Sequence, residues 1–425
     1  MVEGYTDANV SQIVFAMIKP LLAIQDGKPV FVTRPPQFEP GFNRSDSMSM
    51  LDSDSDWPVL IEYLEQFQPK PNTLANYLKE VERFALWLIH EKQKPISAVN
   101  RADWLSYLEF IKAPPAPWCS QRERKFLKDG SLNSAWRPFE IRSVHEPLAT
   151  KSVHINDEPQ LVTGLSESSQ ALAKRIIESM FAFLVVAGHL NASPAMSPRT
   201  RNRSSNTKKS FSERTISDAL VDYTIDTLFH AQKHAKSERE AFGHLRARYI
   251  IQLLVGTGLR LSEAAGHTYA DITIRGERWY LDIVGKGDKP RSIELFQDVI
   301  AVMKEFRLAL GCTSPTPLFN DSMKLIPRKD IRQAITGQRV IQILRKAFDQ
   351  ACMAKLAEAE RTLSTEAKGN LLRDASYLEK ASAHWLRHAH ASYYLKHTGQ
   401  NLKATMDRLG HADVATTMIY IHDTL

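Results

Sequence analysis

A basic, Ser- and Asn-rich segment near the middle of the chain limits what this sequence can fold into. Residues 197–214 read SPRTRNRSSNTKKSFSER, in which six basic side chains stand against one acid, Glu213. Sequence of this composition cannot bury a core and is typical of a flexible linker. Because 425 residues also exceed what one typical hydrophobic core accommodates, we expect a separate domain on each side of this linker.

The part of the chain before the linker is predicted to be helical. Apolar residues recur at helical spacing after Pro71, with Asn72 as the expected cap. A second helix is expected to start near Asn100, with Asp103 in its first turn, and a third to run over about 166–187. We therefore predict a helical domain at 55–196.

Two segments fall outside this helical pattern. Prolines end the second helix, and an insertion is expected at about 113–165. Residues 1–54 are expected to form an N-terminal arm, with one short helix around 9–25 and a Ser/Asp-rich linker at 40–57. The arm is interpreted as a partner-docking segment without a catalytic role. Its expected apolar face consists of Ile13, Phe15, Ile18, Leu21 and Leu22.

The part after the linker, 214–425, also reads as mostly helical. Alternating apolar residues at 279–283 and 292–295, with Gly285 and Gly287 between them, predict a β-hairpin. Residues 356–380 are predicted to form a charged helical insertion. The expected fold class is mainly α with a small β-hairpin or sheet.

Charge and cysteine usage indicate the class of binding partner and the cellular compartment. The formal net charge of +7 and the pI of about 9.1 favour a polyanionic partner. The cysteines Cys119, Cys312 and Cys352 lie far apart and lack C-x-x-C spacing, so neither a zinc site nor a disulfide framework is predicted, and a reducing cytoplasm fits. No basic n-region precedes the apolar stretch 13–24 and no apolar run reaches transmembrane length, so no signal peptide or membrane partner is expected.

Several motifs in the second half together suit chemistry at a phosphodiester. TGLR supplies an arginine, the GKGDK turn a lysine, HWLRH a histidine and an arginine one helical turn apart, and the tail LGHADVATTMIY a histidine and a tyrosine. A tyrosine attacks a phosphodiester only if other groups neutralise the phosphate and protonate the leaving oxygen. The candidate catalytic residues are Arg260, Lys286, His384, Arg387, His411 and Tyr420.

In order and spacing these motifs resemble those of the tyrosine recombinase (phage integrase) family. The resemblance covers 214–425 strongly and parts of 55–195 more weakly. It implies a two-domain DNA clamp, built from a helical SAM-like core-binding domain and a tyrosine recombinase catalytic domain. It also implies site-specific recombination by transesterification through a 3′-phosphotyrosine intermediate, with no metal, nucleotide or other cofactor.

The resemblance also suggests what each residue does. Arg260 and Arg387 would bind the non-bridging oxygens of the phosphate, because arginine stays charged and donates in a fixed fork. His384 and His411 would donate to the phosphate or move protons near it, and Tyr420 would be the nucleophile.

Other residues near these motifs are given supporting roles or remain rivals. Lys286, in the hairpin turn, would protonate the departing 5′ oxygen; Lys289 competes for that role. Otherwise Lys289 and Arg291 are expected to contact the DNA backbone. Glu263 and Asp271 resemble acids that accompany the first arginine and would support Arg260 or the hairpin. The rival tyrosines Tyr393 and Tyr394, and the histidines His388 and His390, are interpreted as packing or structural residues.

The expected partner is double-stranded DNA with paired half-sites, bound by a homo-tetramer or by a hetero-tetramer with a related recombinase. The linker would contact phosphates without reading sequence; the alternative is a solvated joint. The expected location is the cytoplasm, in association with the nucleoid. The linker residues predicted to touch DNA are Arg199, Arg201, Arg203, Lys208 and Lys209.

Alternatives remain at the level of function. A type IB topoisomerase-like enzyme would make the same cut and reseal the same strand, and an accessory DNA-binding protein would not cut at all. For the biological role, the long arm and the insertions favour an integrase or transposase of a mobile element over Xer-type chromosome dimer resolution. Five residues follow Tyr420, so exchange of a C-terminal helix between subunits is not expected.

Overall fold

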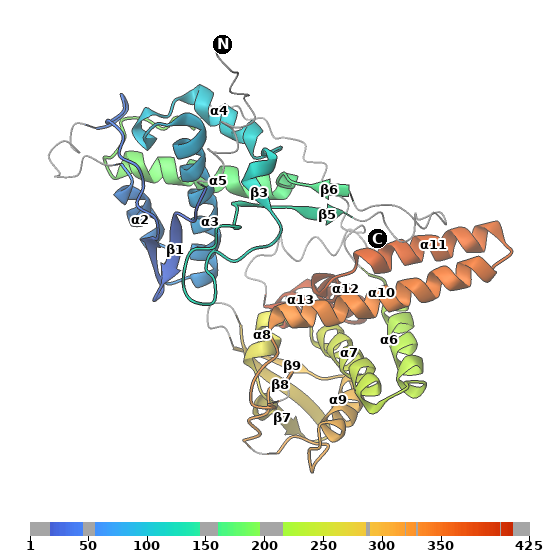
Figure 1. The fold of residues 1–425 in the computed structure, drawn as a ribbon. Coiled ribbons are helices and arrows are strands. Elements are labelled where there is room, and N and C mark those ends of the chain that lie inside the picture. Colours follow the sequence, from blue (N-terminus) through green and yellow to red (C-terminus); the bar gives the residue numbers. More distant parts are fainter. Residues whose placement is uncertain are drawn as a thin grey trace. The chain divides into compact units, whose positions relative to one another are not determined.

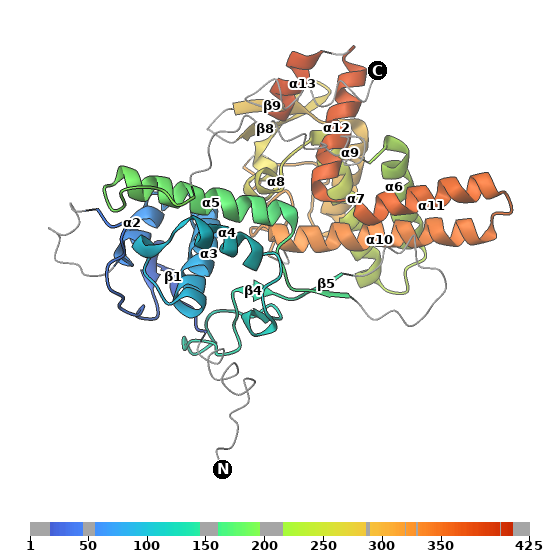
Figure 2. The same cartoon turned by 90° about the horizontal axis from the view of Figure 1, so that it is seen from above.

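The chain forms two compact units (Figure 1), seen in a computed structural model. The first unit contains residues 18–144 and 160–195, and the second contains residues 216–410. Both consist mainly of helices with small sheets, which confirms the predicted fold class (Figures 1 and 2). The structure describes residues 18–45, 56–144, 160–195, 216–285, 290–318, 320–328, 330–399 and 401–410.

Helix α3 (Pro71–Trp87) packs against α2 (Pro58–Glu65) and α5 (Glu167–Val186) in the first unit. Its buried face includes Leu74, Leu78 and Val81, as helical spacing predicts. The helix begins at Pro71, after Lys70, and no side chain caps it. The prediction that Asn72 caps this helix is therefore wrong. Proline suits the first helical position because its fixed φ is preorganised and its missing N–H is not needed there.

The caps of the other two predicted helices agree with the sequence. Helix α4 (Arg101–Phe110) begins with a capping box: the Asn100 side chain accepts from the Asp103 N–H, and the Asp103 carboxylate accepts from the Asn100 N–H, each at 3.0 Å. Ser166 caps α5 by accepting from the Ser169 N–H. Local side-chain chemistry therefore fixes where these helices start.

Residues 18–45 pack into the first unit. Strands β1 (Leu22–Gln25) and β2 (Lys28–Phe31) form a hairpin across Asp26-Gly27, both with positive φ. The helix expected around 9–25 is therefore wrong for 22–25; residues 9–17 lie outside the described part of the chain. An Asp-Gly pair between apolar stretches is a strong hairpin signal, and it decides the local structure.

The apolar residues assigned to a docking face of the arm lie in the core of the first unit. Ile18, Leu21 and Leu22 are each at most 2% exposed and belong to the same hydrophobic cluster as the helices. They are buried within their own subunit, so the expectation that they form a free surface for a neighbour is wrong. Ile13 and Phe15 lie outside the described residues.

The insertion after α4 forms short strands and contacts α3 through individual side chains. Strand β3 (Cys119–Ser120) pairs with β4 (Phe139–Glu140), and β5 (Arg142–Val144) pairs with β6 (Gln160–Val162). Lys125 of the insertion forms an ion pair with Glu82 of α3 at 2.7 Å. The Arg83 guanidinium of α3 donates to the Pro138 carbonyl at 2.9 Å. The insertion is thus held to the helical core by buried polar contacts.

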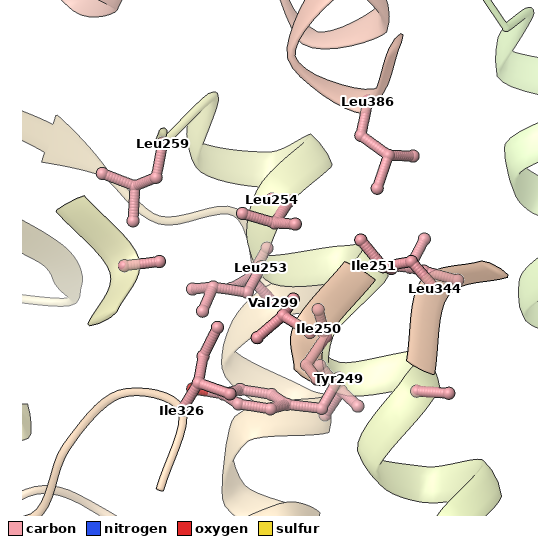
Figure 3. Packing of buried hydrophobic residues seen from close by; sticks show 14 of the residues in the cluster. Tyr249, Ile250, Ile251, Leu253, Leu254, Leu259, Val299, Ile326, Leu344 and Leu386 are labelled. Carbon is pink, nitrogen blue, oxygen red and sulfur yellow. The ribbon is translucent and has the colours of Figure 1, made fainter. Parts of the chain in front are cut away.

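Helix α7 (Glu238–Thr257) lies at the centre of the second unit. Tyr249, Ile250, Ile251, Leu253 and Leu254 are all at most 1% exposed. Figure 3 shows side chains of neighbouring helices, Leu344 and Leu386 among them, gathered around this stretch. A helix that is apolar on several sides suits such a central position. The helices in contact with α7 are α6 (Asp218–Lys233), α9 (Gln297–Ala309), α10 (Gly337–Arg361) and α12 (Ala383–His397).

The predicted hairpin is present as part of a larger sheet. Strand β8 (Arg278–Val284) pairs antiparallel with β9 (Pro290–Glu294), which confirms the hairpin. Strand β7 (Ile272–Arg275) adds to the other edge of β8 and was not expected. Leu281 faces Ile293 on one side and Ile272 on the other, so one apolar row holds the three strands together.

The segment 356–380 is not one helix. Helix α10 ends at Arg361, and α11 (Thr365–Lys380) starts after a short turn and packs back along it. The Ser364 hydroxyl accepts from the Ala367 N–H, so a cap residue inside the charged run creates the break. Among the residues that the structure describes, no helix has both the length and the apolar composition needed to cross a membrane.

Candidate active site

Arg260 stands at the turn between α7 and α8 (Leu261–Gly266), where it is the N-cap residue of α8. Gly258 ends α7 with a φ of +65°, in the left-handed region that favours glycine. A Cβ on Gly258 would lie 2.5 Å from the His390 ring, so a larger residue does not fit. The glycine therefore lets the chain turn tightly and present Arg260.

Glu263 fixes Arg260 through two contacts. Its Oε2 accepts from the Arg260 backbone N–H at 2.8 Å, and its Oε1 accepts from Arg260 Nη1 at 2.9 Å. The carboxylate is only 7% exposed. Burial alone would raise the pKa of Glu263, but the Arg260 N–H and the Arg291 guanidinium outweigh it and lower that pKa below its ordinary value. Glu263 is therefore a carboxylate that stays ionised inside the protein.

Two more guanidinium groups approach the same carboxylate. Arg291 Nη2 donates to Glu263 Oε2 at 2.9 Å, and Arg387 Nη1 lies 4.0 Å from that oxygen. Arg387 also donates through Nη1 to the Gly258 carbonyl and through Nη2 to the Leu409 carbonyl, the latter at 2.5 Å. One carboxylate among three arginines leaves an excess of positive charge. Such a cluster suits the oxygens of a phosphate.

His384 lies on α12, one helical turn before Arg387, and its side chain is exposed. Its ring stands 4.1 Å from the ring of His388, measured between centroids. Partial burial, then the positive charges of Arg387 and Arg260, lower the pKa of His384 below its ordinary value. His384 is therefore near enough to Arg387 and Arg260 for their charges to act on its ring. A neutral imidazole there has one donor nitrogen and one acceptor nitrogen at neutral pH.

Asp271 has a different place from Glu263. Its Oδ2 accepts from the Thr268 N–H at 2.7 Å and lies 3.0 Å from Nδ1 of His267. These contacts cap the short turn Tyr269–Asp271 that leads into β7. Asp271 thus holds the turn before the sheet, whereas Glu263 holds Arg260.

Arg291, which was expected to contact the DNA backbone, has contacts inside the protein. Its side chain is only 9% exposed. Besides its ion pair with Glu263, its Nε donates to the Arg408 carbonyl at 3.0 Å. Both contacts lie inside the protein, so the structure gives Arg291 an internal role. Nothing in its local sequence separates it from an exposed basic residue.

Arg408 and His390 form a buried pair that the sequence did not reveal. Arg408 belongs to α13 (Leu402–Leu409), and its Nε donates to His390 Nε2 at 3.0 Å. Its Nη2 donates to the carbonyls of Gly256 and Glu294, which ties α13 to α7 and to β9. Burial first, and then the charge of Arg408, lower the pKa of His390 to about 3. The partners lie between 18 and 152 residues apart in the chain, beyond the reach of local patterns.

The rival tyrosines take part in packing. The Tyr394 ring stacks on His390 at 5.9 Å between centroids, and the Arg408 guanidinium lies 4.6 Å from that ring. The Tyr393 ring meets Phe296 edge-on at 6.1 Å. The remaining predicted site residues lie outside the described residues: Lys286, Lys289, His411, Tyr420, Arg199, Arg201, Arg203, Lys208 and Lys209.

Comparisons with known proteins give the family and the relatives of this chain. The phage integrase family model matches residues 224–425. The chain is 27% identical over 267 residues to a tyrosine recombinase XerC of Pelobacter propionicus, covering 63% of this chain and 72% of the relative. It is 25% identical over 363 residues to a XerC of Vibrio atlanticus, covering 84% of this chain and 92% of the relative.

A solved structure gives the fold independently. The XerH site-specific recombinase superposes with a TM-score of 0.52 at 15% identity, covering 87% of this chain and 82% of that one. Fold and relatives therefore define a class, the tyrosine recombinases. Residues 224–425 of this chain match the phage integrase family of tyrosine recombinases, and the chain is an enzyme of site-specific DNA recombination.

Proposed function

We propose that this enzyme cuts and rejoins DNA through a covalent link to Tyr420. The observation that carries the proposal is the cluster around Glu263, which holds Arg260 and Arg387 close together beside His384. Two arginines that share one carboxylate are preorganised to bind one phosphate. Charge that is already in place when the transition state forms is the largest common source of catalysis.

In the first step the Tyr420 oxygen attacks the scissile phosphorus. A bond forms between the phenolic oxygen and phosphorus, the bond to the 5′ oxygen breaks, and the DNA is left with a 3′-phosphotyrosine and a free 5′ hydroxyl. A phenol is weakly nucleophilic at its usual pKa of about 10, so nearby cations must favour the phenolate as it forms. Arg260 and Arg387 hold the non-bridging oxygens during this step.

The leaving oxygen needs a proton, which we assign to Lys286. His384 and His411 donate to the phosphate or move protons near it. In the second step a 5′ hydroxyl from the partner duplex attacks the phosphotyrosine, which restores the phosphodiester and frees Tyr420. The phosphotyrosine keeps the bond energy, so no nucleotide is consumed.

For the assembly, we propose that the helical domain and the catalytic domain grip opposite faces of one half-site. A tetramer, of this chain alone or with a related recombinase, then joins two duplexes. The net charge of +7 and the six basic residues of 197–214 support a polyanionic partner. The XerH recombinase was solved bound to a palindromic difH substrate, and a palindrome fits paired half-sites. The proposed location is the cytoplasm, at the nucleoid.

For the biological role, we propose integration or transposition of a mobile element. The insertion at 113–165 and the α10–α11 hairpin support this role as additions to a compact recombinase. A second candidate, Xer-type dimer resolution, is favoured by the names of the relatives, XerC and XerD. Sequencing the DNA bound to the protein in cells separates the two: insertion-element ends support the first, a single chromosomal site the second.

The test of the chemistry uses a nicked suicide duplex that traps the covalent adduct. The wild-type protein is expected to form the adduct, and Tyr420→Phe to bind the DNA without forming it, because only the nucleophilic oxygen is lost. Tyr393→Phe is the matched control and should retain the adduct. An adduct of wild-type yield from Tyr420→Phe would refute the assignment.

Relaxation of supercoiled DNA that lacks any specific site would instead favour a type IB topoisomerase-like activity.

A further inference from the structure

The C-terminal end of α13 is held by two arginines of the active-site cluster. The last carbonyls of a helix have no partners within it and carry partial negative charge. Here the Arg408 carbonyl accepts from Arg291 Nε at 3.0 Å, and the Leu409 carbonyl accepts from Arg387 Nη2 at 2.5 Å. The sequence continues directly from Gly410 into His411 and, nine residues further on, Tyr420.

Arg291 connects this helix end to Arg260 through Glu263. Arg291 donates to Glu263 Oε2 at 2.9 Å, while Oε1 of the same carboxylate accepts from Arg260 Nη1 at 2.9 Å. The exposed fractions of the Arg291 and Glu263 side chains are 9% and 7%, so solvent does little to loosen the pair. An unbroken path of short polar contacts therefore runs from Arg260 to the Arg408 carbonyl.

Gly410 shows that the backbone is shaped around Arg291. Its φ is +63°, and a Cβ at this position would lie 2.7 Å from Arg291 Nη1. Glycine thus allows both the left-handed end of α13 and the close approach of the guanidinium. The end of α13 and the Arg291 side chain therefore pack closely against each other.

We propose that Arg291 is a positioning residue that ties the segment carrying the nucleophile to the phosphate-binding arginine Arg260. The inference rests on the proposed function, in which Tyr420 attacks a phosphate held by Arg260 and Arg387. In this role Arg291 acts through Glu263 and the Arg408 carbonyl. It sets the backbone from which His411 and Tyr420 follow, and a misplacement of about 1 Å in a reacting group costs on the order of 100-fold in rate.

The test compares three variants of the full chain. Arg291→Met removes the donors and keeps the length of the stem, and Arg291→Lys keeps a charge near Glu263 but has no fork to span both partners. Arg278→Met is the matched control, because Arg278 lies on the same sheet, is 70% exposed, and pairs only loosely with Glu294 at 3.7 Å. In single-turnover cleavage of the suicide duplex, Arg291→Met should be slower by about 100-fold. Arg291→Lys should be intermediate, and Arg278→Met unchanged.

Two further readouts separate positioning from DNA contact and from general stability. The affinity for the duplex and its salt dependence should stay at wild-type values in Arg291→Met, whereas loss of a phosphate contact would lower the salt slope by about one. Hydrogen exchange of the backbone at 402–410 should become faster in Arg291→Met and not in Arg278→Met.

If Arg291→Met does not fold, Gly410→Ala tests the same contact, because its Cβ displaces the guanidinium without deleting it. It should slow cleavage and speed exchange at 402–410 in the same way. Cleavage within about threefold of wild type in Arg291→Met, or a salt slope lowered by about one, would overturn the inference. Failure of the wild-type protein to form an adduct would instead refute the proposed function. Exchange at 402–410 then still tests the contact.

Discussion

Two buried carboxylates, Glu82 in the first unit and Glu263 in the second, differ in the charge around them. Glu82 is 1% exposed; its Oε1 accepts from the backbone N–H groups of Leu21 and Leu22 at 3.0 and 2.9 Å, and its Oε2 pairs with Lys125 at 2.7 Å. Glu82 thus joins α3 to the N-terminal hairpin and to the insertion. Its negative charge meets one positive charge, so the site is closed and balanced.

Glu263 is outnumbered by its partners. Arg260, Arg291 and Arg387 all lie within 4.0 Å of its carboxylate, and the first of them is 35% exposed. A buried carboxylate with one cation holds a fold together, whereas one surrounded by three cations leaves positive charge over for a further anion. The number and exposure of the cations, rather than burial of the acid, distinguish a structural tie from a site for phosphate.

The largest expected effect comes from Arg260, the exposed cation of the second site. Arg260→Ala should slow cleavage by about 100- to 1,000-fold or more, because it removes a preorganised partner of the transition state. The unfolding temperature should change little, since Glu263 keeps Arg291. Single-turnover cleavage and thermal unfolding measure the two effects. Arg275→Ala, at an exposed arginine of the neighbouring sheet, is the control. A near-normal rate in Arg260→Ala would refute the view that the surplus charge serves the phosphate.

Glu82→Gln should act in the opposite way, on stability alone. Removing one partner of a buried ion pair leaves the other uncompensated, so we expect a loss of about 3 kcal/mol in the free energy of unfolding. Cleavage by the folded fraction should stay normal. Urea unfolding measures the loss, and Glu109→Gln is the control, since the Glu109–Lys112 pair is exposed and should contribute little. A slower cleavage rate at unchanged stability would contradict the structural role of Glu82.

The sequence predicted the contacts that are local and missed those that are not. Glu263 lies three residues after Arg260, within one helical turn, and was predicted to support Arg260 or the hairpin. Arg291 lies 28 residues from Glu263 and 117 from Arg408, and its basic side chain resembled a DNA contact. Whether such a residue is buried depends on packing between distant elements, which no local pattern encodes.

The same limit applies to the fold. The start of α4 near Asn100 and the β8–β9 hairpin follow from short-range signals and were predicted correctly. The N-terminal hairpin was missed although Asp26-Gly27 marks it, because its apolar residues were assigned to a helix. Strand β7 was missed because it is short and stable only against β8.

A smaller effect is expected from the buried His390, on the dependence of stability on pH. Its folded-state pKa of about 3 lies below the unfolded value of 6.5, so between these values the unfolded chain binds a proton that the folded protein does not. The free energy of unfolding should therefore fall as the pH is lowered from 6.5 towards 3, by up to about 1.4 kcal/mol per pH unit. Above pH 6.5 this contribution is constant.

His390→Gln should flatten that slope, because the glutamine oxygen can still accept from Arg408 and does not titrate. Urea unfolding at several pH values between 4 and 7 measures the slope. His234→Gln, at the exposed histidine that follows α6, is the control and should leave the slope unchanged. An unaltered slope in His390→Gln would show that other groups cause the acid sensitivity.

The smallest expected effect is a change in the pKa of His384, and it tests whether the surplus charge around Glu263 reaches that ring. Partial burial is the main cause of its lowered pKa, and the charges of Arg387 and Arg260 add to it. Arg260→Ala removes one of these charges, so the pKa should rise towards its ordinary value, measured by NMR titration of the ring protons. Glu82→Gln, which alters the balanced site in the other unit, should leave it unchanged. If Arg260→Ala also left the pKa of His384 unchanged, Arg260 would lie too far from His384 to share one phosphate with it. The surplus positive charge around Glu263 would then no longer set that site apart from the balanced site around Glu82.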